Sequence, residues 1–190
     1  MSSLLRDKYL IYRIQTKRDA QAYAELYDRY VSGIYRFISF KVNSKEEAQD
    51  LTSEVFLRAW HYLLESRDVA SFTALIYRIA RNLVIDHYRS RRATISLDEQ
   101  REHDDEETKS PTDMGEQIKL IDLNLDASAV IDAMKHMKEE YRDIMMLRYI
   151  EELTTSEIAE IVGKSHVHVR VLLHRATNIL KTILEKHEPR

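Results

Sequence analysis

The sequence contains no cysteine, which excludes a disulfide framework, a thiolate metal site and a cysteine nucleophile. It has only three glycines and two prolines, too few turn-forming residues for a multi-stranded β architecture. No apolar run approaches the roughly 20 residues that span a bilayer, and the polar start SSLLRDK lacks the hydrophobic core of a signal peptide. These absences predict an all-α, cytoplasmic protein without membrane insertion.

Charge is distributed unevenly along the 190 residues, and the net charge of −3 conceals this. Residues 1–95 hold 16 Lys and Arg against 11 Asp and Glu, which gives +5. Residues 96–127 hold 3 against 11, which gives −8, and residues 128–190 hold 10 against 10. Because an acidic segment offsets a basic amino-terminal half, the whole-chain charge is no argument against nucleic-acid binding. We expect two small helical domains, 1–95 and 128–190, joined by an acidic flexible linker at 96–127.

The helical pattern is lost between the two expected domains. From Thr94 the sequence continues as ISLDEQREHDDEETKSPTDMGEQ, with an acidic cluster at 104–107 and the pair Ser110-Pro111. Such a composition is typical of a mobile linker. Helical periodicity returns at Ala127, and the methionines that follow at helical spacing indicate flexible core filler.

The stretch Thr154–Leu184 predicts a helix, a sharp turn and a second helix. Thr154 and Glu157 have the spacing of a capping box, in which each side chain satisfies a backbone amide at a helix start. Gly163 accepts the left-handed backbone of a tight helix exit, and Ser165 can cap the next helix. The expected inner face of that helix is Val169, Leu172, Leu173, Ala176 and Leu180. This is the helix-turn-helix signature, whose second helix enters the DNA major groove.

The outer face of the second helix is polar and basic. Lys164–Arg190 holds six Lys and Arg against two acids, a balance of +4. Such a face favours phosphate contact, although paired amphipathic helices also occur in domains that never bind DNA. The side chains expected at the DNA are Ser165, His166, His168, Arg170, His174 and Arg175.

In the amino-terminal half, Asp19–Phe40 is predicted to be a helix whose aromatic stripe belongs to the core. Ser44 and Glu47 match a second capping box, which opens a helix that extends to Glu65. Its expected inner residues are Ala48, Leu51, Val55, Ala59 and Leu63. Its other side is expected to show Asp50, Glu54, Phe56, Arg58 and Trp60. Two aromatic rings beside charges indicate a protein-partner surface, and the alternative is that both rings pack on a neighbouring helix.

The next predicted helix combines arginine with tyrosine. Its inner stripe is Phe72, Leu75, Ile76, Ile79 and Leu83. Its outward residues are predicted to be Tyr77, Arg81, Tyr88 and Arg92, with Arg78, Asn82 and Arg89 beside them. From Ser71 to Arg92 there are five arginines and one acid, a balance of +4. Arginine binds phosphates and tyrosine stacks on unpaired bases, so this face favours single-stranded DNA; a solvated basic helix is the alternative.

Taken in order, these segments resemble a bacterial sigma factor of the extracytoplasmic-function (ECF) group. AYAELYDRYVSGIYRFI, EEAQDLTSEVFLRAW and FTALIYRIARNLVIDHYRSRR are similar to the family's promoter-melting region. MKEEYRDIMMLRYIEELTTSEIAEIVGKSHVHVRVLLHRA resembles its carboxy-terminal promoter-binding region. The resemblance covers nearly the whole chain apart from the first residues and the linker.

The resemblance implies a transcription initiation factor, without catalysis or cofactor, that binds the β′ clamp and β subunits of core RNA polymerase and directs the enzyme to promoter DNA. The polymerase-binding residues would be Asp50, Glu54, Phe56 and Trp60. The minus-ten element would be contacted and opened by Phe72, Tyr77, Arg78, Arg81, Asn82, Tyr88, Arg89 and Arg92. The last helix would recognise the minus-thirty-five element, and the acidic linker would thread toward the active-site and RNA-exit channels. Many members of the group are held inactive by an anti-sigma factor.

Two departures from the family pattern bear on DNA contacts. The family usually carries tryptophan where this chain has Leu75, so a wedging or stacking role would fall to Phe72 or Tyr77. Family recognition helices commonly contain VGTVKSRLHRA, and glycine, threonine, serine and arginine of that run are replaced here by Val167, His168, Val171 and Leu172. The two valines are expected either to meet thymine methyl groups or to be buried.

Other classes of protein explain less of the sequence. A stand-alone dimeric helix-turn-helix regulator would bind an operator without polymerase, and a helical interaction protein leaves the two +4 helices unexplained. An enzyme is disfavoured, because there is no H-E-x-x-H pair, glycine-rich phosphate loop or serine-centred elbow. His166 and His168 are two apart and so lie on different helix faces, and His103 stands among acids in the linker, so no metal site is expected.

Overall fold

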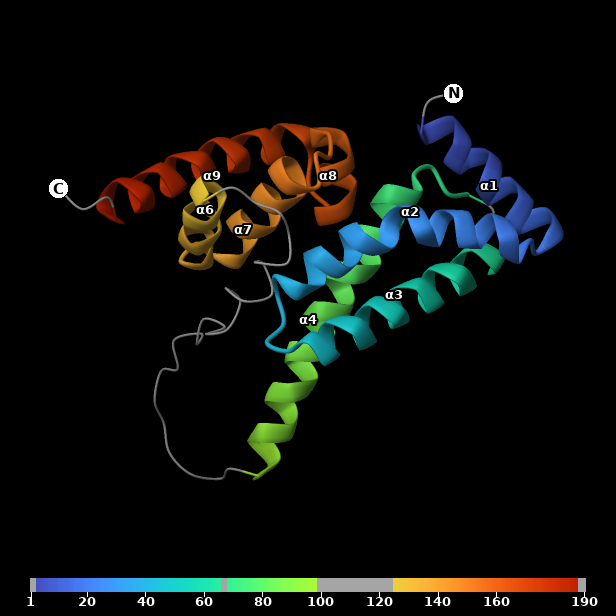
Figure 1. Ribbon diagram of the computed structural model, residues 1–190, viewed down its shortest axis with the longest axis horizontal. Coiled ribbons are helices and arrows are strands. Elements are labelled where there is room, and N and C mark those ends of the chain that lie inside the picture. The colour runs from blue at the N-terminus through green and yellow to red at the C-terminus, as the bar shows by residue number, and fades with distance from the viewer. Residues whose placement is uncertain (1–2, 66–67, 99–124, 188–190) are drawn as a thin grey trace. The chain divides into compact units, whose positions relative to one another are not determined.

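The computed structural model describes residues 3–65, 68–98 and 125–187, and within these ranges the regular structure is helical without strands (Figure 1). The all-α prediction is therefore confirmed. The helices are α1 (Ser3–Lys17), α2 (Ala20–Ser39), α3 (Lys45–Glu65), α4 (Phe72–Asp98), α6 (Leu125–Lys135), α7 (Glu139–Met145), the π-helix η1 (Met146–Ile150), α8 (Thr155–Val162) and α9 (His166–His187). The chain divides into two compact units, Met1–Thr108 and Lys109–Arg190, called unit 1 and unit 2 below.

The predicted linker lies mostly outside the described residues, so its extent and mobility stay predictions. α4 continues to Asp98, so the last turn of this helix overlaps the first residues of the predicted linker. The residues from Thr94 to Asp98 include no glycine or proline. A helix that has already formed adds residues at little cost, and it therefore runs on through a segment of mediocre helix formers.

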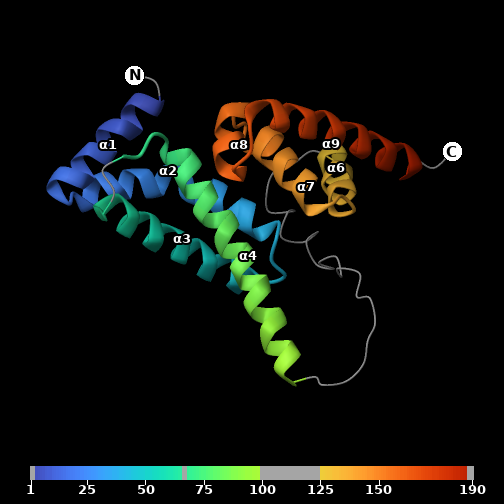
Figure 2. The same ribbon diagram turned by 180° about the vertical axis from the view of Figure 1, so that it is seen from behind.

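Unit 1 begins with a helix for which the sequence analysis makes no prediction. α1 packs against α2 and α3, as the two opposite views in Figures 1 and 2 show. Its buried side chains are Leu10, Ile11 and Ile14, whose helical spacing is the signal that could have predicted it. Asp7 is also buried, and its carboxylate accepts hydrogen bonds from the side chains of Arg29 and Tyr30 on α2. These partners offset the cost of burying its charge.

α2 begins after Asp19, as predicted. The Asp19 carboxylate accepts hydrogen bonds from the backbone amides of Gln21 and Ala22 at 3.0 and 3.1 Å. Nη2 of Arg13, on α1, lies 2.6 Å from Oδ2 of the same carboxylate. The amide of Ala22 and the guanidinium of Arg13 stabilise the ionised form and hold the pKa of Asp19 below its usual value. One side chain thus caps α2 and joins it to α1.

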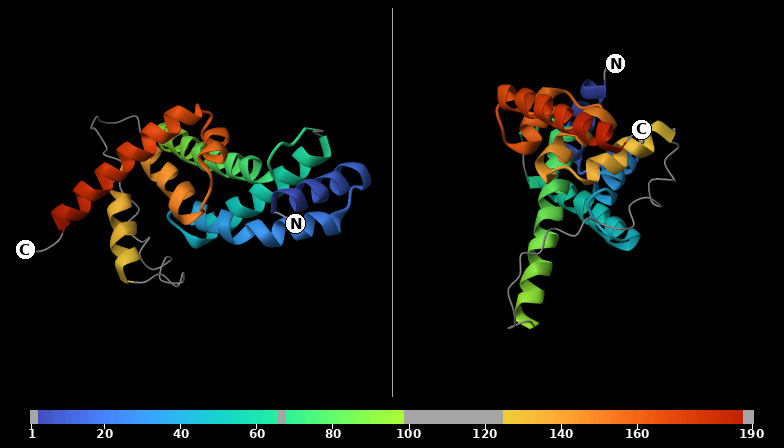
Figure 3. Two further views of the ribbon diagram at one scale, coloured as in Figure 1. Left: turned by 90° about the horizontal axis from the view of Figure 1, so that it is seen from above. Right: turned by 90° about the vertical axis from the view of Figure 1, so that its left-hand side faces the viewer.

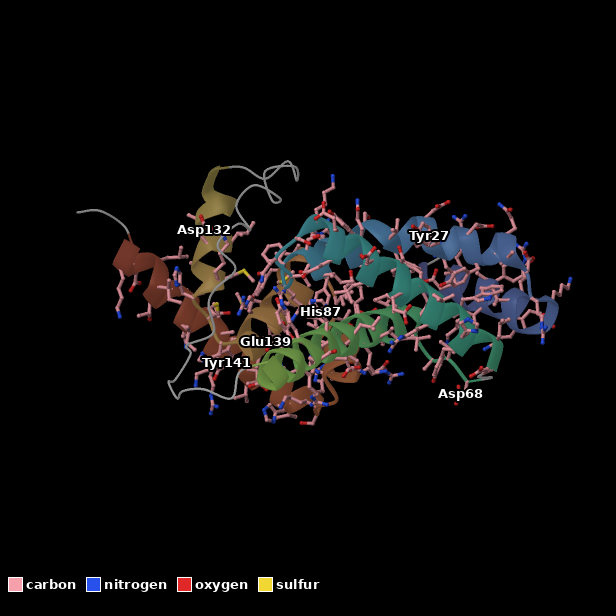
Figure 4. All side chains as sticks on the ribbon, turned by 90° about the horizontal axis from the view of Figure 1, so that it is seen from below. Tyr27, Asp68, His87, Asp132, Glu139 and Tyr141 are labelled. Carbon is pink, nitrogen blue, oxygen red and sulfur yellow. The ribbon has the colours of Figure 1, made fainter. Side chains whose placement is uncertain are left out.

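The aromatic stripe of α2 joins this helix to α3 and α4. Four of its rings each contact a ring on α3 or α4 at centroid separations between 4.5 and 5.5 Å. Each pair is tilted or edge-to-face, the geometry in which a positive ring edge meets a negative ring face. The pairs are Tyr23–Trp60, Tyr27–Phe56, Tyr30–Phe72 and Phe37–Tyr77. Figure 4 shows Tyr27, which lies on α2 and meets its partner ring on α3. The prediction that this stripe packs in the core is confirmed for Phe37, whereas Tyr23 and Tyr30 are half-buried and Tyr27 is 39% exposed.

Unit 2 has an aliphatic and methionine core. α6, α7 and α8 all pack against α9, and Figure 3 shows this group from two further sides. Its buried side chains include Met134, Met137, Ile144, Met145, Met146, Ile158 and Val169. The prediction of methionine as core filler is confirmed. After η1, the amide of Leu153 donates to the carbonyl of Leu147 at 2.9 Å, which closes the turn that leads into α8.

Candidate functional site

The helix-turn-helix of unit 2 forms as predicted. The amide of Glu157 donates to Oγ1 of Thr154 at 3.3 Å, and the amide of Thr154 donates to Oε2 of Glu157 at 2.8 Å, which completes the capping box. Gly163 ends α8 with a φ of 66°, in the left-handed region that glycine adopts without strain. Oγ of Ser165 then accepts a hydrogen bond from the amide of His168 at 3.2 Å, as an N-cap side chain does.

The inner and outer faces of α9 are those that the sequence predicts. Val169, Leu172, Ala176 and Leu180 are buried, and Leu173 is half-buried. The predicted DNA-facing side chains are all exposed: Ser165, His166, His168, Arg170, His174 and Arg175. Nε2 of His166 also lies 2.7 Å from Oγ1 of Thr155, on the first turn of α8. This contact joins the two helices of the motif across their turn.

The two valines on the outer face of α9 are exposed, which excludes the expectation that they belong to the core. Val167 is 71% exposed and Val171 is 44% exposed, whereas Leu172 beside them is buried. The valines line a shallow concavity together with three cationic or titratable side chains, Arg170, His174 and Arg175. The outer face of α9 therefore has an apolar centre and polar, basic edges.

On α4 the exposed stripe differs from the predicted one. Exposed side chains at spacings of four, four and three residues line one side of the helix: Arg78, Asn82, Asp86 and Arg89. The stripe that was predicted to face outward is more buried. Arg81 and Tyr88 are half-buried, and the hydroxyl of Tyr88 donates to the backbone carbonyl of Lys41. Arg92 lies on α4, and its side chain is outside the described residues.

The prediction that Tyr77 faces outward is wrong. Its side chain is 3% exposed, and its ring packs edge-to-face on Phe37 with the centroids 5.5 Å apart. Phe72 is 2% exposed and packs against Tyr30. α4 packs on both α2 and α3, so its buried arc is wider than the single stripe that periodicity indicates. Neither Phe72 nor Tyr77 presents a ring that could wedge between DNA bases or stack on them.

A carboxylate at the start of α3 engages the end of the basic segment of α4. The amide of Glu47 donates to Oγ of Ser44 at 3.0 Å, which confirms half of the second predicted capping box. The Glu47 carboxylate itself turns to the amide of Asn43 at 3.3 Å and to Nη1 of Arg91 at 3.2 Å. His87, labelled in Figure 4, places Nε2 3.7 Å from the same carboxylate. Arg91, one of the five arginines of this segment, is thus engaged within unit 1.

The prediction that Phe56 lies on the outer side of α3 is also wrong. Phe56 is 3% exposed, and its ring centroid is 4.5 Å from that of Tyr27. Trp60 is half-buried, with its ring 4.9 Å from that of Tyr23. The hydroxyl of Tyr23 donates to the carbonyl of Phe56, and burial raises the pKa of Tyr23 well above its usual value. The alternative interpretation, in which both rings pack on a neighbouring helix, is the correct one.

The outer stripe of α3 includes a residue that the sequence analysis missed. Leu57 is 53% exposed on the side of the helix opposite Val55 and Ala59. Spacings of four, three and four residues place it in one line of side chains: Asp50, Glu54, Leu57 and His61. Nε of Arg58 lies 2.7 Å from Oε1 of Glu54 beside this line. In the sequence, a leucine at helical spacing from Asp50 and Glu54, and off the apolar stripe of the helix, could have indicated this surface.

Two kinds of site are absent from the part of the chain that the structure describes. Among those residues, no helix is both long enough and apolar enough to cross a membrane. No group of three or more His, Cys, Asp or Glu side chains in the same ranges is arranged to hold a metal ion.

Two stretches of the chain match known protein families. Residues 26–94 match Sigma-70 region 2, and residues 127–178 match Sigma-70, region 4. The chain is 33% identical over 171 residues to the ECF RNA polymerase sigma factor BldN of Streptomyces coelicolor, which covers 87% of this chain and 61% of BldN. It is 29% identical over 170 residues to the ECF RNA polymerase sigma factor SigW of Bacillus subtilis, which covers 87% of this chain and 90% of SigW.

Solved structures share the fold. The chain aligns with CnrH, solved in complex with the cytosolic domain of CnrY, at a TM-score of 0.70 and 20% identity over 96% of this chain and 99% of CnrH. It aligns with the sigma factor RpoE of Bartonella quintana, solved in complex with the anti-sigma factor NepR, at a TM-score of 0.65 and 16% identity over 87% of this chain and 98% of RpoE. The two family matches follow each other in the expected order and together span more than half of the sequence. The chain belongs to the ECF group of bacterial sigma factors, the initiation factors that direct RNA polymerase to promoters.

Proposed function

We propose that the chain divides promoter recognition between its two units while core RNA polymerase carries both. α9 binds the minus-thirty-five element as a duplex in the major groove, and the exposed stripe of α4 binds the minus-ten strand as it separates. The observation that carries this proposal is that each unit exposes a helix face with arginines, Arg78 and Arg89 on α4 and Arg170 and Arg175 on α9. Two basic faces on one chain suit two separate DNA elements better than one operator site.

Capture of the separated strand by α4 supplies the free energy for melting. Unstacking costs a few kcal/mol for each base that leaves the duplex, and binding of the freed strand offsets that cost. With the rings of Phe72 and Tyr77 buried, the capture surface offers guanidinium and amide groups, with one carboxylate, Asp86, between Asn82 and Arg89. It would bind phosphates and base edges through Arg78, Asn82 and Arg89, with Arg81 at its border.

The outer stripe of α3 is the proposed polymerase-binding surface. Leu57 supplies an exposed apolar contact, while Asp50 and Glu54 supply acidic groups around it. An apolar centre with a charged rim is the usual anatomy of a protein interface. Trp60, at the edge of this surface, is half-buried. The docking partner proposed for the stripe is the clamp coiled coil of the β′ subunit, with further contacts to β.

Neither DNA-binding face needs high affinity on its own. Once polymerase holds both units, the second DNA contact becomes intramolecular and gains from a high effective concentration. We therefore expect weak DNA binding by the free chain and strong, salt-sensitive binding by the holoenzyme, because phosphate contacts release counterions. RpoE was solved with an anti-sigma factor, and a regulatory partner of that kind, acting in the cytoplasm, is proposed for this chain as well.

Run-off transcription tests the proposed function. Core polymerase is incubated with genomic promoter fragments, with and without the chain. The expected result is a set of discrete transcripts that require the chain. If no fragment gives a chain-dependent transcript although the chain is folded, the proposal is wrong. If the purified chain alone protects a palindromic operator, it is a stand-alone regulator instead.

A further inference from the structure

We infer that Val167 and Val171 recognise thymine methyl groups, so that the minus-thirty-five element bound by this chain contains thymine where the centre of α9 meets the base edges. The inference rests on the proposed function, because it requires α9 to lie in the major groove of a duplex. Beyond the binding of α9 to the minus-thirty-five element, it specifies thymine as the base and Val167 and Val171 as the side chains that select it.

The first observation is the position of the valines on α9. They are one helical turn apart and lie opposite the buried residues Val169 and Ala176. Both are exposed, and both line the shallow concavity on this helix. Single exposed aliphatic side chains are common, but two in register at the centre of a DNA-facing surface form a defined apolar contact.

The second observation is the charge around them. Along the helix, Arg170 and His174 lie on one side of the valines, and His168 and Arg175 lie on the other. A helix in the major groove has phosphates along both of its sides and base edges beneath its centre. The basic edges therefore fit the two backbones and the apolar centre fits the bases. This charge pattern favours DNA over an apolar protein partner.

The bases differ in the groups that they present in the major groove. Thymine presents a C5-methyl group in the major groove, whereas guanine, adenine and cytosine present mainly hydrogen-bonding groups. Valine cannot donate or accept a hydrogen bond, so against those bases it would leave polar groups unsatisfied. Side chains at positions i and i+4 of a helix are about 5–6 Å apart. Base pairs are stacked about 3.4 Å apart, so the two valines reach thymines within one or two steps of each other.

The test begins with the holoenzyme and a library of promoter duplexes randomised across the minus-thirty-five element. The expected enriched sequence contains thymine at one or two neighbouring positions. Each of these thymines is then replaced by deoxyuridine, which removes only the methyl group. We expect the affinity of the holoenzyme to fall about fourfold for each methyl that a valine contacts, from the transfer free energy of one such group.

The variants Val167→Ala and Val171→Ala connect the methyl groups to the side chains. Both positions are exposed, and alanine is the better helix former, so the fold should be retained; a circular dichroism unfolding curve checks this. We expect one or both variants to bind the thymine and deoxyuridine duplexes equally. Thr182→Ala, on the exposed side of the same helix beyond the concavity, is the matched control and should keep the preference for thymine.

The outcomes separate this inference from the proposed function. If the holoenzyme enriches a sequence but binds its thymine and deoxyuridine forms equally, the inference is wrong and the proposed function stands. The inference is equally wrong if both valine variants keep the preference for thymine, or if they lose polymerase binding while the preference is unchanged. If no sequence is enriched at all, the proposed function fails, and the inference fails with it.

Discussion

Both units expose a basic helix, but their hydrophobic cores differ in composition. Unit 1 is built on ring pairs that join α2 to α3 and α4, and these pairs bury Phe37, Phe56, Phe72 and Tyr77. From Leu125 to His187 the chain has no phenylalanine or tryptophan, and unit 2 packs isoleucine, leucine and methionine instead. In unit 2 the large apolar side chains exposed on α9, within the residues that the structure describes, are Val167 and Val171.

This difference shows when an unexpected apolar residue marks a binding surface. In unit 1, Phe56 and Tyr77 interrupt polar faces in the sequence, but both rings are buried against aromatic side chains of neighbouring helices. In unit 2, the valines lie opposite the core and no neighbouring helix covers them. A large ring beside an aromatic-rich helix should therefore first be interpreted as a core residue. Small aliphatic residues at the centre of an exposed cationic face are candidates for a binding surface.

The largest effect expected from this comparison is the loss of a ring from unit 1. Phe56→Ala should lower the free energy of unfolding by about 3–5 kcal/mol, because it removes a buried ring and leaves a cavity against Tyr27. The chain's single tryptophan, Trp60, reports on unit 1 alone, so its fluorescence during urea unfolding measures the change.

The neighbouring residue is the matched control. Leu57→Ala should change stability by less than about 0.5 kcal/mol, because the side chain is exposed, and it should weaken binding to core polymerase. If Phe56→Ala instead left stability intact and weakened polymerase binding, the aromatic core of unit 1 would be the wrong description of this position.

A smaller effect is expected from the turn of unit 2. Gly163→Ala should lower the free energy of unfolding of the helix-turn-helix by about 1–2 kcal/mol, because alanine is strained at a φ of 66°. A Cβ at this position would meet no atom within 4 Å, so the cost comes from the backbone alone. Hydrogen exchange of the α8 and α9 amides measures it. Gly163→Asn should cost less, since asparagine tolerates this conformation, and equal protection in all three proteins would contradict the prediction.

The smallest effect is the pH dependence that Asp19 gives to unit 1. The pKa of this carboxyl is lowered in the folded state, so its contribution is present above the unfolded pKa of about 3.9 and is lost as the pH falls through the folded value. Asp19→Asn should therefore flatten the acid side of the stability curve measured by Trp60 fluorescence. Hydrogen exchange in unit 2 should be unchanged. If stability fell equally steeply with pH in the unmodified protein and in Asp19→Asn, the pH dependence could not be assigned to Asp19.

The sequence predicted those parts of the fold that depend on local chemistry. The capping box of Thr154, the left-handed turn at Gly163 and the inner face of α9 all follow from side chains within a few residues of one another. The buried arc of α4 does not, because its width depends on two neighbouring helices that periodicity along a single helix cannot reveal. For that reason the basic character of α4 was predicted correctly and its exposed stripe was misplaced. α1 was missed because its apolar residues are interrupted by exposed Tyr9 and Tyr12.

The division of labour between α4 and α9 is tested most directly by open-complex formation on two templates, one fully paired and one with an unpaired minus-ten element. The α4 variant carries Arg78→Ala and Arg89→Ala, and the α9 variant carries Arg170→Ala and Arg175→Ala; all four side chains are exposed, so the fold should be retained. The α4 variant is predicted to be slow on the paired template and close to the unmodified protein on the unpaired one, while the α9 variant binds weakly to both. If the unpaired template rescues both variants equally, or neither, the two helices do not act on different forms of DNA.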